Sequence, residues 1–140
     1  MTTIAYHHDD KTISVDSRAS TSSRIHTDNS NKIIKNHIGI WFYTGLSGDA
    51  PYLTMLHHND KPDVEPDGAA YLIKDSKVYL VTMNDGFCIY CEIDYNHAIG
   101  SGDDFALAAM DFGRGSKDAV KYAMTRDFKT GGKVQTVKVK

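Results

Sequence analysis

The sequence has few of the residues that define special classes of protein. Its 140 residues include two cysteines and three prolines, and the formal net charge is −2. So small an excess of charge gives no electrostatic basis for binding nucleic acid or an anionic membrane. The longest apolar stretches, such as Ile38 to Tyr43, are far shorter than the ~20 residues that span a bilayer. The first residues lack the basic and apolar regions of a signal peptide, so we expect a cytoplasmic protein.

The two cysteines form a C-x-x-C pair, Cys88 and Cys91, inside a segment typical of a strand. Residues three apart on a strand point to opposite faces, and a zinc site needs further ligands. We therefore interpret both cysteines as structural and expect neither a metal nor an organic cofactor. Two histidine-rich segments, 7–10 and 57–60, lie at predicted turns, and we interpret them as solvated surface.

The length of the chain and its 41% hydrophobic residues fit a single domain spanning residues 1–140. Apolar runs predict strands at residues 2–6, 12–15, 32–35, 38–44, 70–73, 78–81, 88–93 and 133–139. A short helix is expected within residues 49–57, and longer ones at residues 105–110 and from Ser116 onward. Residues 20–31 and 59–68 are polar and predict loops. Antiparallel sheets with helices packed outside them account for this order.

Thr2 becomes the first residue if Met1 is removed. A free N-terminal threonine then carries a nucleophile and a base on one residue, because its hydroxyl can attack while its α-amine takes the proton. The α-amine titrates near ~7.7–8.0, close to the pH at which a general base works best.

Such a hydrolase needs further groups around the threonine. A lysine near the hydroxyl would favour the alkoxide, and an aspartate would keep that lysine charged and in place. A backbone N–H in a glycine turn would stabilise the oxyanion, an effect often worth ~3–4 kcal/mol. The chain has candidates of these types at strand ends and in turns: Asp16, Lys32, Gly48, Ser101, Asp127 and Thr130.

Three segments come in order along the chain: the opening Thr2-Thr3-Ile4-Ala5, then Val15-Asp16-Ser17-Arg18-Ala19, then Lys32-Ile33. Together they resemble the start of proteasome β-subunits and of the bacterial peptidase HslV. Three later segments resemble the family's oxyanion-hole turn, serine-glycine turn and aspartate loop: Ser47 to Ala50, Ala98 to Gly102, and Asp127 to Gly132.

The resemblance implies an N-terminal nucleophile (Ntn) hydrolase. It also implies the family's α+β fold, a four-layer αββα sandwich of two antiparallel sheets. Family members usually carry two long helices after the oxyanion turn, but only residues 49–58 and an acidic loop occupy that interval here. We therefore expect one helical layer to be reduced.

The resemblance also implies a role for each candidate residue. Thr2 is the nucleophile and its freed amine is the base, while Lys32 tunes the hydroxyl and Asp16 holds Lys32. The Gly48 N–H serves the oxyanion, with Gly45 as the competing donor if the alignment of this turn slips. Three more residues support the amine: Ser101, Asp127 and Thr130.

We therefore expect a threonine-type peptidase that cleaves peptides or unfolded proteins through an acyl-enzyme on Thr2. The family implies a ring-forming homo-oligomer. It leaves an ATPase partner open here, because the helices that contact such ATPases are shortened or missing. Two alternatives remain: a non-catalytic assembly or binding protein of the proteasome fold, and an Ntn amidase acting on small amides.

Overall fold

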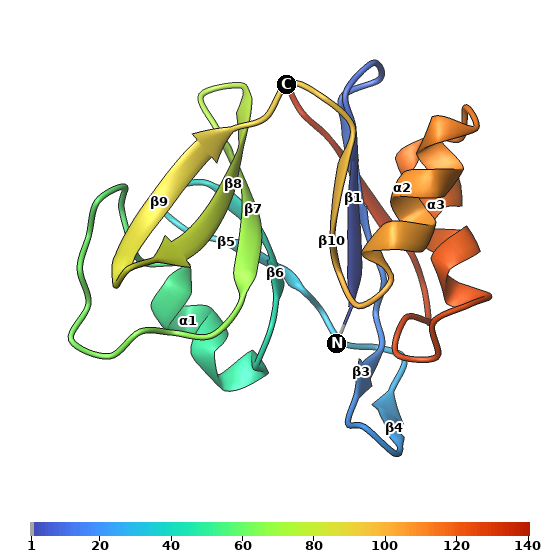
Figure 1. Cartoon of the computed structure of the whole chain (residues 1–140), viewed down its shortest axis with the longest axis horizontal. Helices are drawn as coiled ribbons and strands as arrows, with labels where there is room; N and C mark the ends of the chain where they lie inside the picture. The colour runs from blue at the N-terminus through green and yellow to red at the C-terminus, as the bar shows by residue number, and fades with distance from the viewer. Residues whose placement is uncertain (1) are drawn as a thin grey trace. The chain divides into compact units, whose positions relative to one another are not determined.

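A computed structural model describes residues 2–140 (Figure 1). Met1, and with it the prediction that Met1 is removed, lies outside the described residues. The chain divides into two compact units, Met1–Lys32 with Asp94–Lys140, and Ile33–Ile93. The prediction that residues 1–140 form one domain stays a prediction.

The first unit is built on a four-stranded antiparallel sheet in the order β10-β1-β2-β11. The hairpin predicted near the start of the sequence is present, as β1 (Thr3–His7) and β2 (Thr12–Val15). β10 (His97–Gly100) pairs with the free edge of β1, and β11 (Gln135–Lys138) pairs with β2. β1 is therefore held between two neighbours, which fixes the position of the residues at its start.

Two helices cover one face of this sheet, α2 (Asp103–Asp111) and α3 (Ser116–Met124) (Figure 1). Both were expected from the sequence. Small side chains dominate the buried cluster between helices and sheet, including Ala5, Ala106 and Ala119. Small residues let helix and sheet backbones approach closely, so the loops at the helix ends are held near the start of β1.

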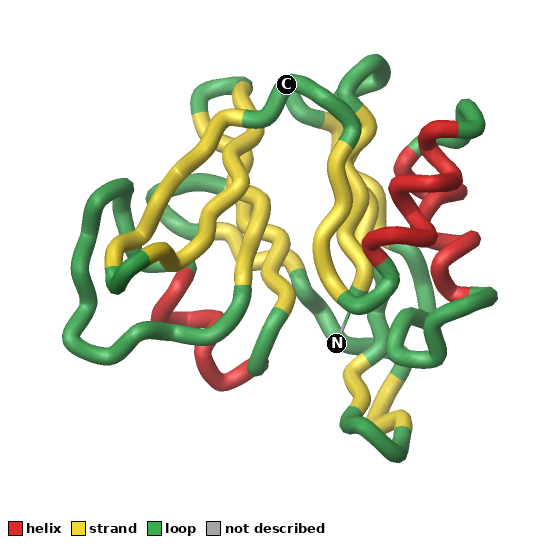
Figure 2. The backbone as a smooth tube through the Cα atoms, in the orientation of Figure 1, coloured by secondary structure: helices red, strands yellow, loops and turns green. Residues whose placement is uncertain are grey.

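A two-stranded hairpin of β3 (Ala19–Ser20) and β4 (Ile25–Thr27) also belongs to the first unit (Figure 2). The sequence predicted only a polar, turn-rich segment there. β4 is exposed along its whole length, so no buried apolar alternation marks it as a strand.

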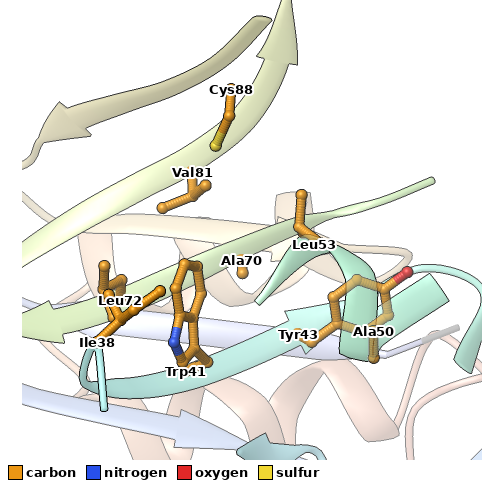
Figure 3. Close-up of a cluster of buried hydrophobic side chains, with 9 residues drawn as sticks. All are labelled: Ile38, Trp41, Tyr43, Ala50, Leu53, Ala70, Leu72, Val81 and Cys88. Carbon is orange, nitrogen blue, oxygen red and sulfur yellow. The ribbon is translucent and has the colours of Figure 1, made fainter. Parts of the chain in front are cut away.

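The second unit is a five-stranded antiparallel sheet in the order β5-β6-β7-β8-β9. Its strands are β5 (Ile33–Lys35), β6 (Ile40–Thr44), β7 (Ala69–Lys74), β8 (Lys77–Asn84) and β9 (Phe87–Glu92). A 3₁₀ turn (Ser47–Asp49) leads into α1 (Ala50–Leu53). The side chains of Trp41, Leu53, Leu72 and Val81 gather in one buried cluster (Figure 3).

The two cysteines lie on β9 with different surroundings. Cys88 is buried in the cluster of Figure 3, whereas Cys91 is exposed, and both are free thiols. The prediction that they point to opposite faces of a strand is confirmed.

The predicted four-layer αββα sandwich is wrong. Residues 2–140 are mostly β-structure, with eleven strands in three antiparallel sheets and α-helices of only four, nine and nine residues. The helix expected within residues 49–57 ends at Leu53, and no helix follows before β7 in this described part of the chain. That interval holds Pro62 and Pro66, and proline has no N–H for a helical hydrogen bond. One turn of helix cannot form a layer.

None of the helices in residues 2–140 is long and apolar enough to cross a bilayer.

Candidate active site

The Thr2 hydroxyl lies between two charged groups in the first unit. It donates a hydrogen bond to Asp16 Oδ1 and accepts one from Lys32 Nζ. The lysine also contacts the same carboxylate oxygen directly, at 2.8 Å from Nζ to Oδ1. Thr2 is 2% exposed and Asp16 is fully buried, so these interactions are shielded from water. The structure thus brings together the predicted nucleophile, lysine and aspartate.

The β1–β2 hairpin accounts for the position of Thr2 beside Asp16. Ile4 pairs with Val15 in the sheet, so the residues just before β1 lie beside those just after β2. The Asp16 N–H donates to the Thr3 carbonyl at 3.4 Å and extends this pairing by one residue. A one-residue slip in register would turn every side chain of the hairpin to the other face of the sheet. The packing of Ile4 and Val15, both fully buried, therefore also fixes the site.

Backbone groups hold the Asp16 carboxylate in place. Its Oδ1 accepts from the Thr3 N–H at 3.2 Å, and its Oδ2 accepts from the Gly131 N–H at 2.9 Å. A buried charge is tolerated when it is paired and hydrogen-bonded, and Asp16 satisfies both conditions. Its position is therefore set by the first residue of β1 and by the loop that contains Gly131.

Burial lowers the pKa of Lys32, and attraction to Asp16 offsets only part of that effect. The charge of Arg18 lowers it further. The ammonium is therefore more acidic than a surface lysine while it still donates to the Thr2 hydroxyl. Such a donor stabilises negative charge that develops on the threonine oxygen.

Ser101, Asp127 and Thr130 form a second hydrogen-bonded group. The hydroxyls of Ser101 and Thr130 both donate to Asp127 Oδ2, at 2.5 Å and 2.7 Å. Burial opposes ionisation of Asp127, but these bonds outweigh it and hold the pKa of this carboxyl below its ordinary value. The structure brings these three candidate residues, which come from two separate segments of the sequence, together in one hydrogen-bonded group.

This second group contacts the backbone of Thr2. The Ser101 N–H donates to the Thr2 carbonyl at 2.7 Å, and the Ser101 hydroxyl lies 3.3 Å from the same oxygen. Gly100 makes the close approach possible: its φ is +101°, and a Cβ there would collide with the Thr2 carbonyl. Thr2 is thus held through its side chain by one group and through its carbonyl by the other.

Sequence reasoning missed Thr3, which links the two groups. Its N–H donates to Asp16, and its hydroxyl lies 2.6 Å from the Thr130 hydroxyl. The neighbouring Gly102 packs so closely on Thr3 that a side chain would not fit. A polar residue inside the predicted apolar strand, directly after Thr2, was a signal that the sequence contained.

Arg18 and Asp28 were also missed. The guanidinium forms a two-point ion pair with Asp28, at 2.7 and 3.1 Å, and donates to the Phe128 carbonyl at 2.7 Å. It lies against Gly131, whose N–H binds Asp16. We call these residues, Arg18 and Asp28, the arginine clamp.

Gly48 lies in the second unit, on the exposed 3₁₀ turn Ser47–Asp49. Its role as oxyanion donor stays a prediction, as does that of Gly45. Within this unit the turn is well supported: the Tyr43 hydroxyl lies 2.7 Å from the carbonyls of both Leu46 and Asp67, and the Asp67 carboxylate accepts from the Leu46 N–H at 3.0 Å.

Within residues 2–140, no group of three or more His, Cys, Asp or Glu side chains is arranged to hold a metal ion. His57 and His58, in the histidine-rich segment 57–60, are both exposed.

No family model matches the chain, and no curated protein matches it either. Among solved structures, the chain is similar to BPH of Thiobacillus denitrificans in complex with epoxomicin, with a TM-score of 0.72 and 16% sequence identity over 99% of both chains. It is also similar to a structure of Thiobacillus denitrificans BPH, with a TM-score of 0.71 and 15% identity over 100% of this chain and 99% of the other. At such low identity the similarity shows a shared fold alone.

Proposed function

We propose that this protein is an N-terminal threonine hydrolase of the type found in proteasome β-subunits and HslV, and that it cleaves peptide bonds. One observation carries the proposal: the buried Thr2 hydroxyl lies between the Lys32 ammonium and the Asp16 carboxylate. Each of these buried charges would destabilise the fold without the other. A threonine that served only packing would need neither of them beside its hydroxyl.

The reaction begins when removal of Met1 frees the α-amine of Thr2. The hydroxyl oxygen attacks the carbonyl carbon of the substrate amide while the α-amine takes the hydroxyl proton. The C–N bond then breaks, and the leaving amine takes that proton. The product is an ester on Thr2 Oγ1. A water molecule attacks this ester, gives its proton back to the threonine oxygen, and releases the acid.

Lys32 and Asp16 have separate tasks in this scheme. Lys32 stabilises the negative charge that develops on the Thr2 oxygen, and its lowered pKa strengthens it as a donor. Asp16 fixes the lysine at 2.8 Å and keeps it charged despite burial. Preorganised donors of this kind are typically worth ~3–4 kcal/mol of transition-state stabilisation.

Ser101, Asp127 and Thr130 orient the main chain of Thr2 so that its amine faces its own hydroxyl. The proposal for these residues rests on the Ser101 bonds to the Thr2 carbonyl. The oxyanion role of Gly48 rests on the resemblance to the family alone.

Peptide hydrolysis tests the proposal. Fluorogenic peptides should be cleaved by the wild type and not by Thr2→Ala, whereas Thr2→Ser should keep measurable activity because it retains a hydroxyl. A panel of small amides assayed in parallel separates a peptidase from an amidase. A wild type with a free Thr2 that cleaves neither class would favour the binding-protein alternative.

Epoxomicin, which is in complex with BPH in one of the similar structures, offers a probe for this chain too. We also propose that the protein works in the cytoplasm on peptides or unfolded proteins, as a homo-oligomer. These points follow the family and are independent of the local chemistry at Thr2.

A further inference from the structure

Thr3 directly follows the proposed nucleophile and is the first residue of β1, where its side chain is fully buried. Its three polar groups all bind within the candidate active site. Its N–H donates to Asp16 Oδ1 at 3.2 Å, and its carbonyl accepts from the Asp16 N–H at 3.4 Å. Its hydroxyl lies 2.6 Å from that of Thr130. Thr3 is therefore attached to both groups that surround Thr2, to one by its main chain and to the other by its side chain.

The direction of the hydrogen bond between Thr3 and Thr130 follows from the protons that are present. A hydroxyl has one proton to donate and can accept as well. Thr130 gives its proton to the Asp127 carboxylate, at 2.7 Å. The Thr3 hydroxyl must therefore donate to Thr130, and the chain of donors ends at a carboxylate. A charged acceptor strengthens such a chain, because hydrogen bonds to ionised groups are about twice as strong as neutral ones.

Gly102 leaves the space that the two hydroxyls occupy. Its φ is −102°, outside the left-handed region that favours glycine, so its backbone does not explain why it lacks a side chain. A Cβ at this position would collide with the Thr3 hydroxyl oxygen and would lie 3.1 Å from that of Thr130. The absence of a side chain at residue 102 is therefore explained by the space that this hydrogen bond needs.

We propose that Thr3 is a positioning residue for Thr2, and that its hydroxyl is the part of the side chain that matters. The inference rests on the proposed function, because it concerns the same nucleophile. Asp16 and Lys32 hold the Thr2 hydroxyl, while Thr3 and its partners hold the peptide group on the other side of the Thr2 Cα. With both of these fixed, the α-amine has one remaining direction, since all three are attached through the same Cα.

Thr3→Ala and Thr3→Ser test the proposal together, because the two variants differ from each other by the hydroxyl alone. In the hydrolysis of fluorogenic peptides, Thr3→Ala should lower kcat at least ~10-fold, since a misplacement of about 1 Å can cost ~10²-fold. KM should stay within about twofold, because the loss arises in the transition state. Thr3→Ser should retain most of the wild-type kcat. If Thr3→Ala fails to fold, as judged by circular dichroism, Thr3→Val replaces it, since valine keeps the shape and lacks the hydroxyl.

Thr12→Ala is the matched control. Thr12 lies at the other end of the β1–β2 hairpin, and its hydroxyl also bonds to a second hydroxyl, that of Ser116 at 2.7 Å, and to a carboxylate, that of Asp10 at 2.6 Å. Its variant should lose comparable bonds and keep the wild-type kcat. An equal fall in kcat in Thr12→Ala would overturn the proposal, because general loosening of the sheet would then account for it. Equal activity of Thr3→Ala and Thr3→Ser would overturn it too, because the hydroxyl would then not matter.

The exchange rate of the Ser101 amide tests the proposal without any measurement of activity. This N–H donates to the Thr2 carbonyl at 2.7 Å, so it reports whether that peptide group is held in place. By NMR, it should exchange at least ~10-fold faster in Thr3→Ala than in the wild type and should be unchanged in Thr12→Ala. A wild type that cleaves no peptide would contradict the proposed function, and the Ser101 rate would still decide whether Thr3 positions Thr2. An unchanged rate in Thr3→Ala would overturn the positioning role in either case.

Discussion

The charges of Asp16 and Lys32 depend on each other, because both groups are shielded from water. The Lys32 side chain is 11% exposed and that of Asp16 is 0% exposed. A buried ion pair contributes little net stability, but removing one partner leaves an uncompensated charge in a poorly hydrated place. Function and stability can therefore be separated experimentally at these two positions.

Lys32→Met should destabilise the protein by ~3–5 kcal/mol, because Asp16 then loses its cation while it remains buried. It should also slow peptide hydrolysis by roughly 10²–10³-fold, because the Thr2 hydroxyl loses its charged donor. Urea unfolding measures the first effect and the rate of hydrolysis the second.

The double variant Asp16→Asn with Lys32→Met separates the two effects. With the carboxylate neutralised, stability should recover by at least ~1 kcal/mol relative to Lys32→Met alone. Hydrolysis should stay at the level of the single variant. Recovery of activity together with stability would mean that Lys32 has only a structural role.

The Asp127 carboxyl makes stability depend on pH. Its folded-state pKa lies below the ordinary value of 3.8, so its contribution is present above that pH and is lost as pH falls through the folded pKa. Ser101→Ala removes one of the two hydroxyl donors and should raise the pKa of Asp127, which ¹³C NMR titration of the carboxyl measures. The difference in unfolding free energy between wild type and variant should therefore narrow as the solution is acidified below about pH 4.

Thr125→Ala is a suitable control for this prediction. Thr125 also bonds through its hydroxyl, at 2.6 Å to the Tyr122 carbonyl, but its partner does not titrate. The change that Thr125→Ala causes in the free energy of unfolding should therefore not vary with pH. The same pH dependence in both variants would contradict the account of Asp127.

Six of the seven candidate residues lie in one unit, and the sequence pointed to them through segments that resemble the family in order along the chain. A hydrolase built on a threonine needs a cation, its counter-ion and a support for the amine, and few side chains can supply them. Thr3 and the arginine clamp were missed because they act on the geometry of the site and not on the reaction. The position of Asp28 beside Arg18 depends on how β3 and β4 pair.

At the scale of elements, the loop from Asp127 to Gly132 deserves a separate experiment because it joins three parts of the first unit. Its Phe128 carbonyl accepts from Arg18, its Gly131 N–H donates to Asp16, and its Asp127 carboxylate accepts from Ser101. The arginine clamp thus acts on the site through this loop.

Gly131→Ala should detach the arginine clamp, because the added methyl group would occupy the position of the Arg18 guanidinium. We expect a loss of ~1–3 kcal/mol in stability, the usual range for overpacking. Amide exchange at residue 131 should quicken, and hydrolysis should slow as the N–H leaves Asp16. Hydrogen exchange followed by mass spectrometry measures the local change.

Arg18→Ala relieves the same collision. In a protein that already carries Arg18→Ala, Gly131→Ala should therefore lower the free energy of unfolding much less than it does in the wild type. Additive losses would show that Gly131 is required for another reason.

The longer elements were predictable because their patterns are regular. β6 coincides with an aromatic, apolar run, and the buried residues of α3, between Ser116 and Met124, recur with a period of 3.6 residues. β10 was not predicted, since its residues His97–Gly100 are mixed in character and pair only because β1 offers an edge. Local pattern cannot reveal such a strand, because its stability comes from its partner.

At the scale of the whole molecule, resemblance predicted too much helical structure. Eight of the eleven strands in the described residues were expected from the sequence, and β3, β4 and β10 were not. The four-layer architecture was taken from the family and not from this chain. The interval after α1 contains two prolines and many polar residues, and it forms loop up to β7 at Ala69. The side chains proposed to act around Thr2 all belong to the first unit, and only the proposed oxyanion donor Gly48 belongs to the second. None of these side chains lies in the interval where the expected helical layer is missing.

The proposed mechanism requires Thr2 to be a nucleophile with a free amine, so the intact mass of the native protein is the decisive measurement. The mass should be that of a chain beginning at Thr2. Incubation with epoxomicin should add one inhibitor molecule, located on Thr2 by peptide mapping and absent from Thr2→Ala. A protein that keeps Met1 throughout and gains no mass with epoxomicin would contradict the account, because the base would be blocked and the hydroxyl inert.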